Sequence, residues 1–318
     1  RRSSDLEAYF SSICIGGILM SKINGIKGDR WRYKPGQNKV FPISRSKFGE
    51  YLKCKRCFYL NTIKGLKSPS MPGWPLNSAT DEMLKFEFDI HRKNQTQHPE
   101  MKKNNSLKNV VPFQHKDIDE WRRNFGGFKV LDKDLNLELK GAIDDVWIDL
   151  KSKELIIVDY KSTSKKEIKE DAWLADEYSQ DYLKQMNFYK FIFEKAGHKV
   201  KTTFFYIVNG LKKDRPFNNS MEFEPHLIEY QPSTKQIPAQ LQEMKKLMDS
   251  KTLPDVNSDC ESCNYLNAGK HITKIEDLDL EIESLLALVK SAKKHEVKNL
   301  EKKIKDLENR KGELEKDD

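Results

Sequence analysis

The sequence predicts a mixed α/β fold, in which one mixed β-sheet is flanked by helices and followed by a C-terminal helical extension. Three observations predict it. Amphipathic segments at helical spacing precede a run of short alternating segments in the middle of the chain. A further helical segment separates these from one more apolar strand, and the C-terminal residues change to charged heptads.

The chain divides into three predicted regions. Residues 1–40, interrupted by Pro35-Gly36, form an N-terminal segment to which we assign no structure. Residues 41–273 form the main domain, and residues 274–318 form a charged helical tail. The chain does not begin with Met, so we expect its first region to be a fragment or a cloning remnant.

Two amphipathic segments predict helices near the start of the main domain. The first begins at Ser44 or Ser46, either of which can act as its N-cap, and the second covers Ser78–His91. The loop Ser68–Pro75 separates them, and the polar residues 92–108 predict another loop. The residues expected to face inward are apolar: Phe48, Tyr51, Leu52, Met83, Leu84 and Phe88.

The middle of the chain predicts the sheet. Leu135–Lys140, Ala142–Leu150 and Glu154–Asp159 have strand patterns and short connections, so we expect an antiparallel meander. A helix containing Tyr182–Lys195 follows, and then a strand at Thr202–Asn209. This order indicates one mixed sheet flanked by helices.

The C-terminal tail contains two series of apolar residues at heptad spacing, offset from one another by one residue. The offset predicts either one helix with a skip or a helical hairpin. Because the heptads are few, we expect them to be stabilised by packing or by homo- or hetero-oligomer formation through this helix. The two series are Ile275, Leu278, Ile282, Leu285 and Val289, and Val297, Leu300, Ile304 and Leu307.

Composition restricts the class of protein. With 57 basic and 49 acidic residues the net charge is +8, which favours a polyanionic partner such as nucleic acid. A soluble basic protein without such a partner explains the charge equally well. The longest apolar stretch, Ile13–Met20, is too short to cross a bilayer, so we expect no membrane association and a cytoplasmic protein.

Two acids and a lysine form the candidate catalytic group. Asp144 and Asp159 lie near equivalent ends of neighbouring predicted strands, so their carboxylates can converge. With the backbone carbonyl of Tyr160 they offer hard oxygen ligands suited to Mg²⁺ or Mn²⁺. Lys161 leaves the strand on the same face as Asp159, where it can orient or deprotonate a water and neutralise charge on phosphorus. The alternative is that these are turn and strand-end residues.

Three neighbouring features favour the catalytic interpretation. The apolar run Leu155–Val158 puts the Asp-x-Lys triplet at the end of a buried strand. Gly141 permits close backbone approach just before Asp144. Gln185 and Tyr189 lie one turn apart on the following helix and face the same side.

Two Cys-x-x-Cys pairs predict a second metal site. Cys54 and Cys57 are separated from Cys260 and Cys263 by some two hundred residues. Four thiolates suit Zn²⁺ or an iron–sulfur cluster, which would join the early helix to the C-terminal side of the domain. Unpaired thiols or disulfides are the alternatives, although a reducing compartment disfavours disulfides. We expect Cys14 to be a packed thiol.

The ordered motifs GAIDDV, IIVDYKST and QMNFY resemble motifs II and III and the Q-x-x-x-Y helix of the RecB-like branch of the PD-(D/E)xK nuclease superfamily. The organisation is also similar to that of the CRISPR-associated exonucleases with a cysteine cluster. The resemblance covers roughly residues 44–265. It implies a restriction-endonuclease-like fold and a metal-dependent phosphodiesterase that acts on DNA.

The resemblance also implies residue roles. Asp144 and Asp159 would be metal ligands, Lys161 the catalytic lysine, and Gln185 and Tyr189 would position the nucleic acid or steady the metal site. Related nucleases close the domain with a [4Fe–4S] cluster held by one early and three late cysteines. This chain has two early and two late cysteines, so Zn²⁺ stays an alternative.

The first ligand of the family departs from the usual pattern. Family members often have a His three positions after a Gly in an early helix, whereas this chain has Ser78 and Asp81 at those places. A carboxylate suits Mg²⁺ better than an imidazole does, so Asp81 is the first candidate. Glu87 is the second and His91 the third. Asp81 and Glu87 lie on different helical faces and are not expected to bind one metal.

These observations predict a DNA nuclease of exonuclease or flap type that prefers single-stranded ends and serves repair, recombination or defence. A non-catalytic nucleic-acid-binding subunit of a larger complex is the alternative. Lys165, Lys166 and Lys169 are expected to contact phosphates. Interleaved basic and aromatic residues at 31–34 and 121–125 suit single strands, although Trp121 and Phe125 are equally compatible with a core.

Overall fold

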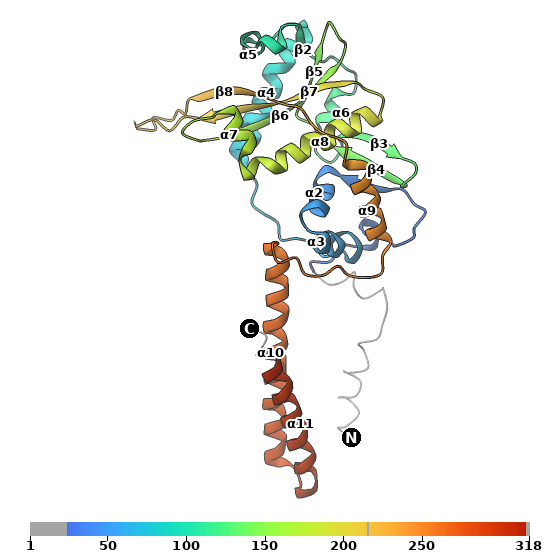
Figure 1. Cartoon of the computed structure of the whole chain (residues 1–318). Helices are drawn as coiled ribbons and strands as arrows, with labels where there is room; N and C mark the ends of the chain where they lie inside the picture. Colours follow the sequence, from blue (N-terminus) through green and yellow to red (C-terminus); the bar gives the residue numbers. More distant parts are fainter. Residues whose placement is uncertain (1–23, 215, 316–318) are drawn as a thin grey trace. The chain divides into compact units, whose positions relative to one another are not determined.

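A five-stranded sheet in the order β2-β5-β6-β7-β8 forms the centre of the chain. The computed structural model describes residues 24–214 and 216–315 (Figure 1). In this sheet β6 and β7 are parallel and the other neighbours are antiparallel, so the sheet is mixed, as predicted. Its strands are β2 Val110–Pro112, β5 Asp145–Asp149, β6 Leu155–Thr163, β7 Val200–Gly210 and β8 Phe223–Tyr230.

A smaller sheet has the order β1-β4-β3, with β1 Phe41–Ser44, β3 Phe128–Asp132 and β4 Leu137–Gly141. The predicted three-strand meander is therefore wrong in its first strand, because β4 pairs with β1 and β3 instead of β5. The chain leaves the ladder after Gly141, where the backbone of Gly127 approaches so closely that a Cβ on Gly127 would lie 2.6 Å from it. The remaining pair, β5 and β6, is antiparallel as expected.

Two helix starts follow from a cap or a proline in the sequence. Ser44 Oγ accepts a hydrogen bond from the Lys47 N–H at 3.1 Å, which confirms Ser44 as the N-cap of α2. Part of the predicted loop 92–108 is helical, because Pro99 starts a short helix. The helices before residue 253 are α2 Arg45–Lys53, α3 Lys55–Tyr59, α4 Pro75–Asn94, α5 Pro99–Lys103, α6 Ile118–Arg122, α7 Glu170–Ala175, α8 Gln180–Lys195 and α9 Ile237–Asp249, with a π-helical turn at Leu60–Lys64.

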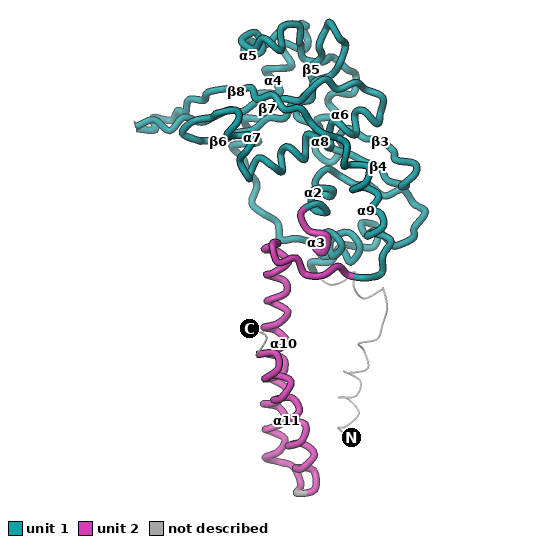
Figure 2. Tube along the Cα trace, in the orientation of Figure 1, with its two compact units in different colours: residues 1–52, 58–252 teal, residues 53–57, 253–318 magenta. Residues whose placement is uncertain are grey.

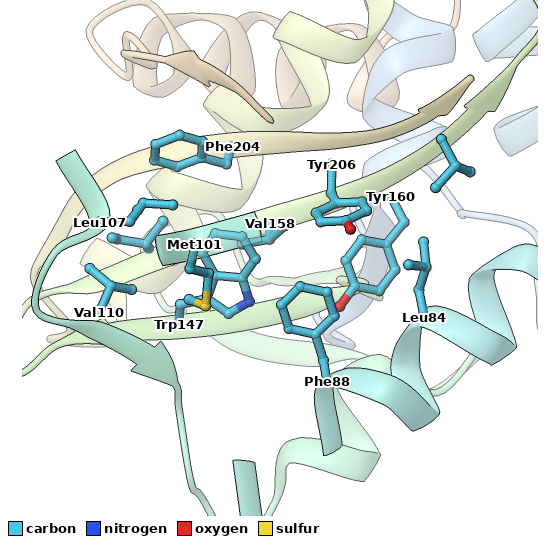
Figure 3. Close-up of a cluster of buried hydrophobic side chains, with 12 residues drawn as sticks. Leu84, Phe88, Met101, Leu107, Val110, Trp147, Val158, Tyr160, Phe204 and Tyr206 are labelled. Atoms are coloured by element: carbon cyan, nitrogen blue, oxygen red, sulfur yellow. The ribbon is translucent and has the colours of Figure 1, made fainter. Parts of the chain in front are cut away.

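A hydrophobic core lies between α4 and one face of the central sheet (Figure 3). Phe88 of α4 stacks on Trp147 at a centroid distance of 5.4 Å and packs against Tyr160 and Tyr206. Leu84 and Phe88 face inward as predicted, whereas Met83 is 70% exposed, which corrects that prediction. Because side chains alternate along β6, Tyr160 belongs to this core while Asp159 and Lys161 point to the opposite face, toward α8.

The chain forms two compact units (Figure 2). The first comprises Arg1–Leu52 and Phe58–Thr252, and the second comprises Lys53–Cys57 and Leu253–Asp318. The three-region division at residues 40 and 273 stays a prediction, and Cys14 and Ile13–Met20 lie outside the described residues.

The second unit contains a helical hairpin, which confirms the second alternative for the tail. α10 Glu261–Ser291 and α11 Lys294–Leu314 meet at the turn where the two heptad series are offset. Glu296 accepts a hydrogen bond from the Lys293 N–H at 3.1 Å and so caps α11. None of the described helices combines the length and apolarity that crossing a bilayer requires. The residues packed between the two helices are Leu278, Ile282, Leu285, Val289, Ile304, Leu307 and Leu314.

Candidate active site and cysteine cluster

Asp144 and Asp159 come together through the pairing of β5 with β6. Asp145 is paired with Val158, so the residue before β5 lies across from Asp159. Asp144 Oδ2 accepts a hydrogen bond from the backbone N–H of Tyr160 at 2.8 Å. The two carboxylates that the sequence predicted to converge therefore share one end of this strand pair.

Asp159 is buried and lies between two partners. Its Oδ1 accepts a hydrogen bond from the Gln185 amide of α8, and its Oδ2 forms an ion pair with the Lys161 ammonium. Oδ2 is buried and accepts no well-oriented hydrogen bond from any described residue. A buried carboxylate oxygen with only an ionic neighbour has room in its coordination for a cation.

The charged groups of the site shift the pKa values of Asp144 and Lys161. Burial raises the pKa of Asp144 to about 7, and Asp159 and Asp81 raise it as well, while Lys161 and Lys85 oppose them. Burial lowers the pKa of Lys161, but Asp159 and Asp144 outweigh that effect and raise it above its ordinary value. A buried carboxyl group that resists ionisation beside other acids, as Asp144 does, is typical of a site that gains free energy by binding a cation.

Asp81 reaches the same region from α4. A hydrogen bond between Thr80 and Ser162 joins the start of α4 to β6. Asp81 forms an ion pair of 2.7 Å with Lys85 and lies close enough to Asp144 to affect its pKa. Among the described residues, the acids of this region do not bring three ligand atoms within 4.8 Å of one another.

Glu87 and His91, the other candidates for the first ligand, have different partners. Glu87 Oε1 lies 2.7 Å from His98 Nε2, and His91 Nδ1 lies 3.0 Å from the Thr96 hydroxyl. His98 itself stacks on Phe88 in the core. Asp81 is one of the main groups that raise the pKa of Asp144, so it is the candidate that the structure connects to the acidic pair.

Gln185 and Tyr189 of α8 support both acidic segments. Gln185 holds Asp159, and the buried Tyr189 hydroxyl donates a hydrogen bond to the Ala142 carbonyl. A Cβ at position 141 would lie 2.5 Å from the Tyr189 ring, so only glycine fits there. Both side chains are oriented to fix the acids in place.

Sequence reasoning missed a buried network behind the acids. Asp145 is fully buried and forms an ion pair with Arg92 of α4. Its Oδ2 accepts hydrogen bonds from Trp147 Nε1 at 3.1 Å and from the Tyr160 hydroxyl at 2.9 Å. The sequence did contain a sign of this network, because Asp145 follows Asp144 in GAIDDV and alternation along the strand puts its side chain on the face toward α4.

Tyr182 is a second residue that the sequence did not indicate. Its ring lies 4.6 Å below the Lys161 ammonium, at the start of α8, and it stacks at 6.2 Å on the buried Trp173. The ring therefore contacts the same cation that pairs with Asp159. Nothing in its spacing distinguishes it from other exposed tyrosines of the segment, such as Tyr178.

The residues that were predicted to contact nucleic acid lie in different environments. Trp121 is buried against Phe128 and Phe193, as the core alternative has it, whereas Phe125 is exposed. Trp31 is exposed, and Arg30 lies 4.9 Å over its ring. The remaining basic residues near β6 are Lys165, paired with Asp176, Lys169, paired with Glu167, and the exposed Lys166.

The four cysteines of the two Cys-x-x-Cys pairs pack together within the second unit. Ligand atoms of Cys54, Cys57 and Cys260 lie within 4.8 Å of one another, and Cys57 Sγ is 3.7 Å from Cys260 Sγ. Backbone N–H groups of Cys57 and Asn257 donate to the sulfurs of Cys54 and Cys263. Such N–H···S bonds are the usual support for thiolates that bind a metal.

The electrostatics of the cluster fit a metal site. Burial and the neighbouring sulfurs of Cys54 and Cys260 raise the pKa of Cys57 well above its ordinary value. A bound cation reverses that effect, because a coordinated thiol is deprotonated. The four-sulfur donor set suits Zn²⁺ and iron–sulfur clusters alike.

The family model of the PD-(D/E)XK nuclease superfamily matches residues 76–268. This range is more than half of the chain and contains Asp81, both acidic strands, Lys161 and α8. No curated protein matches the chain.

Proposed function

The chain belongs to the PD-(D/E)XK nuclease superfamily, whose members are typically metal-dependent nucleases, and on that basis we propose that it hydrolyses phosphodiester bonds in DNA. We further propose an exonuclease or flap-type enzyme that prefers single-stranded ends and acts in repair, recombination or defence. The observation that carries the proposal is the convergence of Asp144, Asp159 and Lys161 on one side of the β5–β6 pair.

Asp144 and Asp159, with Asp81 and the Tyr160 carbonyl, are the groups that would hold Mg²⁺ or Mn²⁺. The buried Asp159 Oδ2 and the raised pKa of Asp144 fit such a cation. When bound, a divalent ion supplies Lewis-acid chemistry, which polarises a phosphate oxygen and lowers the pKa of water.

Lys161 contributes a positive charge to the reaction. Its raised pKa keeps the ammonium protonated at neutral pH, so it is suited to donate hydrogen bonds to the attacking water or to a phosphate oxygen. The Tyr182 ring and the Asp159 carboxylate hold the ammonium from two sides. Gln185 and Tyr189 keep the acids in position while the substrate binds.

The cysteine cluster supports a structural cofactor, either a [4Fe–4S] cluster or Zn²⁺. Together with the ordered motifs, it favours the RecB-like branch and a similarity to the cysteine-cluster exonucleases. The cluster belongs to the second unit and Asp144 and Lys161 to the first, so its proposed role is stabilisation and not chemistry.

The decisive experiment measures cleavage of labelled single- and double-stranded DNA with Mg²⁺ or Mn²⁺. We expect wild type to cleave and Asp144→Asn and Lys161→Ala to lose at least about a hundredfold in rate, since each removes charge that acts in the transition state. Lys151→Ala, an exposed lysine in the turn between β5 and β6, is the matched control and should retain activity. Cleavage that persists in both site variants would refute the assigned residues.

The same assay separates the alternatives. Circular single-stranded DNA should stay intact if the enzyme needs a free end, while the linear form is degraded. Wild type that binds DNA but cleaves neither form with either cation would favour the non-catalytic nucleic-acid-binding subunit. An oligomer formed through the hairpin stays a prediction, which sedimentation of the full chain tests.

A further inference from the structure

Arg45, the first residue of α2, has a charged side chain that the described structure leaves without an acidic partner. Its Nε is buried and has no hydrogen-bond partner, and no carboxylate among residues 24–214 and 216–315 forms an ion pair with it. A guanidinium is always protonated, and a buried donor without an acceptor is costly. The guanidinium does form a side-chain hydrogen bond with Tyr189, so its partner is a neutral phenol and not an anion.

Other buried arginines of the same unit are compensated. Arg92 pairs with Asp145 and Asp89, and Arg122 pairs with Asp89 through two bonds of 2.9 Å. Arg45 thus departs from the pattern that this fold otherwise follows. A half-buried guanidinium with only a phenol as partner keeps donors that an anion can use, so Arg45 is a candidate for binding one.

The position of Arg45 connects it to the acidic site. β1 pairs in parallel with β4, and its last residue, Ser44, is opposite Lys140. Arg45 therefore follows β1 where Gly141 follows Lys140, three residues before Asp144. The Tyr189 ring packs against Gly141.

The pKa of Tyr189 is affected by Arg45 and by both acids. Burial raises the pKa of Tyr189, Arg45 opposes that effect, and Asp159 and Asp144 add to it. One phenol therefore lies within electrostatic reach of the arginine and of both acids. Those acids are already held by the Tyr160 N–H, Gln185 and Lys161, so they do not neutralise Arg45.

Further positive charge gathers at the start of α2. Lys47 lies 4.7 Å over the Phe41 ring and is within electrostatic reach of Lys27 and Lys140, with Glu50 as the acid of the group. The N-terminus of this nine-residue helix adds partial positive charge. An anion approaching Arg45 meets a favourable field.

We propose that Arg45 is a substrate-binding residue that accepts a phosphate of the nucleic acid next to the bond that is cleaved. The planar guanidinium matches two phosphate oxygens, which the Lys161 ammonium cannot do. The inference rests on the proposed nuclease function and adds a phosphate subsite to it. The phosphate belongs to an internal diester or to a strand end.

The test measures binding of labelled single-stranded DNA in the presence of EDTA, over a series of salt concentrations. We expect Arg45→Gln to weaken binding about tenfold and to reduce the slope of log K against log salt by about 0.7, the value for one lost phosphate contact on a single strand. Arg45→Lys should restore the slope but only part of the affinity. Arg310→Gln, an exposed arginine of α11 in the second unit, is the control.

A second arm changes the DNA instead of the protein, so it holds even if Arg45→Gln fails to fold. A single neutral methylphosphonate, moved along the strand, should weaken wild-type binding at one linkage, and that loss should be smaller in Arg45→Lys and vanish in Arg45→Gln. Substrates with a terminal phosphate or hydroxyl distinguish an end from an internal diester, and dependence on either supports the subsite.

Folded Arg45→Gln with unchanged affinity and salt slope, in a chain whose wild type cleaves DNA, would overturn the Arg45 assignment alone. Equal sensitivity of wild type to methylphosphonate at every linkage would overturn it too. Wild type that neither binds nor cleaves DNA would instead reject the nuclease function from which the inference starts.

Discussion

The carboxylate of Asp144 is held by the backbone of Tyr160, whose N–H donates to Asp144 Oδ2 at 2.8 Å. The side chain of the same Tyr160 points to the other face of the sheet, where its hydroxyl donates to Asp145 at 2.9 Å. One residue thus joins the acidic site to the core between α4 and the sheet. The position of the Asp144 carboxylate therefore depends on packing in the core between α4 and the sheet, on the opposite face from the acidic site.

Removing the buried partner of Arg92 should strongly destabilise the protein. Asp145→Ala removes the buried carboxylate that pairs with Arg92, leaves only the partly exposed Asp89 as its charge partner, and should cost roughly 3–5 kcal/mol in the free energy of unfolding. Asp119→Ala removes an exposed partner of Arg122 and should cost below about 1 kcal/mol. Denaturant unfolding of both variants measures the difference, and equal losses would contradict the role given to Asp145.

Cation binding should depend on pH through Asp144. The raised pKa of about 7 means that the folded protein holds this proton more tightly than the unfolded chain. Without a cation, the contribution of Asp144 to stability is therefore greatest below about pH 4 and is lost as pH rises through about 7.

A divalent cation displaces that proton, so its apparent affinity should fall about tenfold per pH unit below about 7. The Mn²⁺-induced rise in melting temperature, compared at pH 6 and pH 8, measures this. Asp144→Asn should abolish most of the rise at both values. A rise that is independent of pH in wild type would argue against Asp144 as a ligand.

A methyl group at position 141 should disturb the acidic segment. Gly141→Ala brings a Cβ to 2.5 Å from the Tyr189 ring and should destabilise by roughly 1–3 kcal/mol, with lower activity. Gly49→Ala, in α2 where a Cβ meets nothing within 4 Å, should be neutral or stabilising by up to about 1 kcal/mol. Thermal unfolding of both variants tests this, and an unchanged melting temperature in Gly141→Ala would contradict it.

The thiols of the second unit should govern metal content more than catalysis. Cys260→Ser is expected to lower bound zinc or iron and the melting temperature, and chelation of wild type should have the same effect. Ser262→Ala, in the same Cys-x-x-Cys turn, should change neither. Elemental analysis and the absorption spectrum identify the metal, and full metal content in Cys260→Ser would exclude that ligand.

We expect the aromatic ring of Tyr182 to contribute to activity through its π-face, and its hydroxyl to contribute little. Tyr182→Phe should keep kcat, whereas Tyr182→Leu should lower it about threefold to thirtyfold, the range of a cation–π contact on Lys161. Tyr178→Leu, at an 86% exposed tyrosine one turn earlier, is the control. Equal rates for the Phe and Leu variants would remove Tyr182 from the site.

Local pattern was sufficient to predict the part of the fold that carries the chemistry. Strands β6 and β7 and helix α8 were foreseeable, because their apolar runs are long and a helix must connect parallel strands. Residues 135–140 have the same alternating pattern, but nothing local shows which strand they pair with. Their partner β1 lies about a hundred residues earlier.

The candidate site shows the same limit. Asp144, Asp159 and Lys161 were predicted from strand ends, whereas Asp81 was preferred to Glu87 only because it stands three residues after Ser78, where the family pattern has its first ligand. Asp81 shares its phase with the buried Leu84 and Phe88, which carry it to β6. Arg45 could not be identified from the sequence, because its lack of a carboxylate partner among the described residues is known only from the folded structure.

The second unit has consequences for how the protein is made. Its parts, Lys53–Cys57 and Leu253–Asp318, are separated in the chain by the whole central sheet. At ribosomal speeds of about 5–20 residues per second, roughly 10–40 s pass between synthesis of Cys57 and of Cys260. During that time the central sheet can fold while the chain is still on the ribosome, and Cys54 and Cys57 do not yet have the other two cysteines beside them. Because the four cysteines are the proposed ligands of one cofactor, that site is complete only after translation passes Cys263.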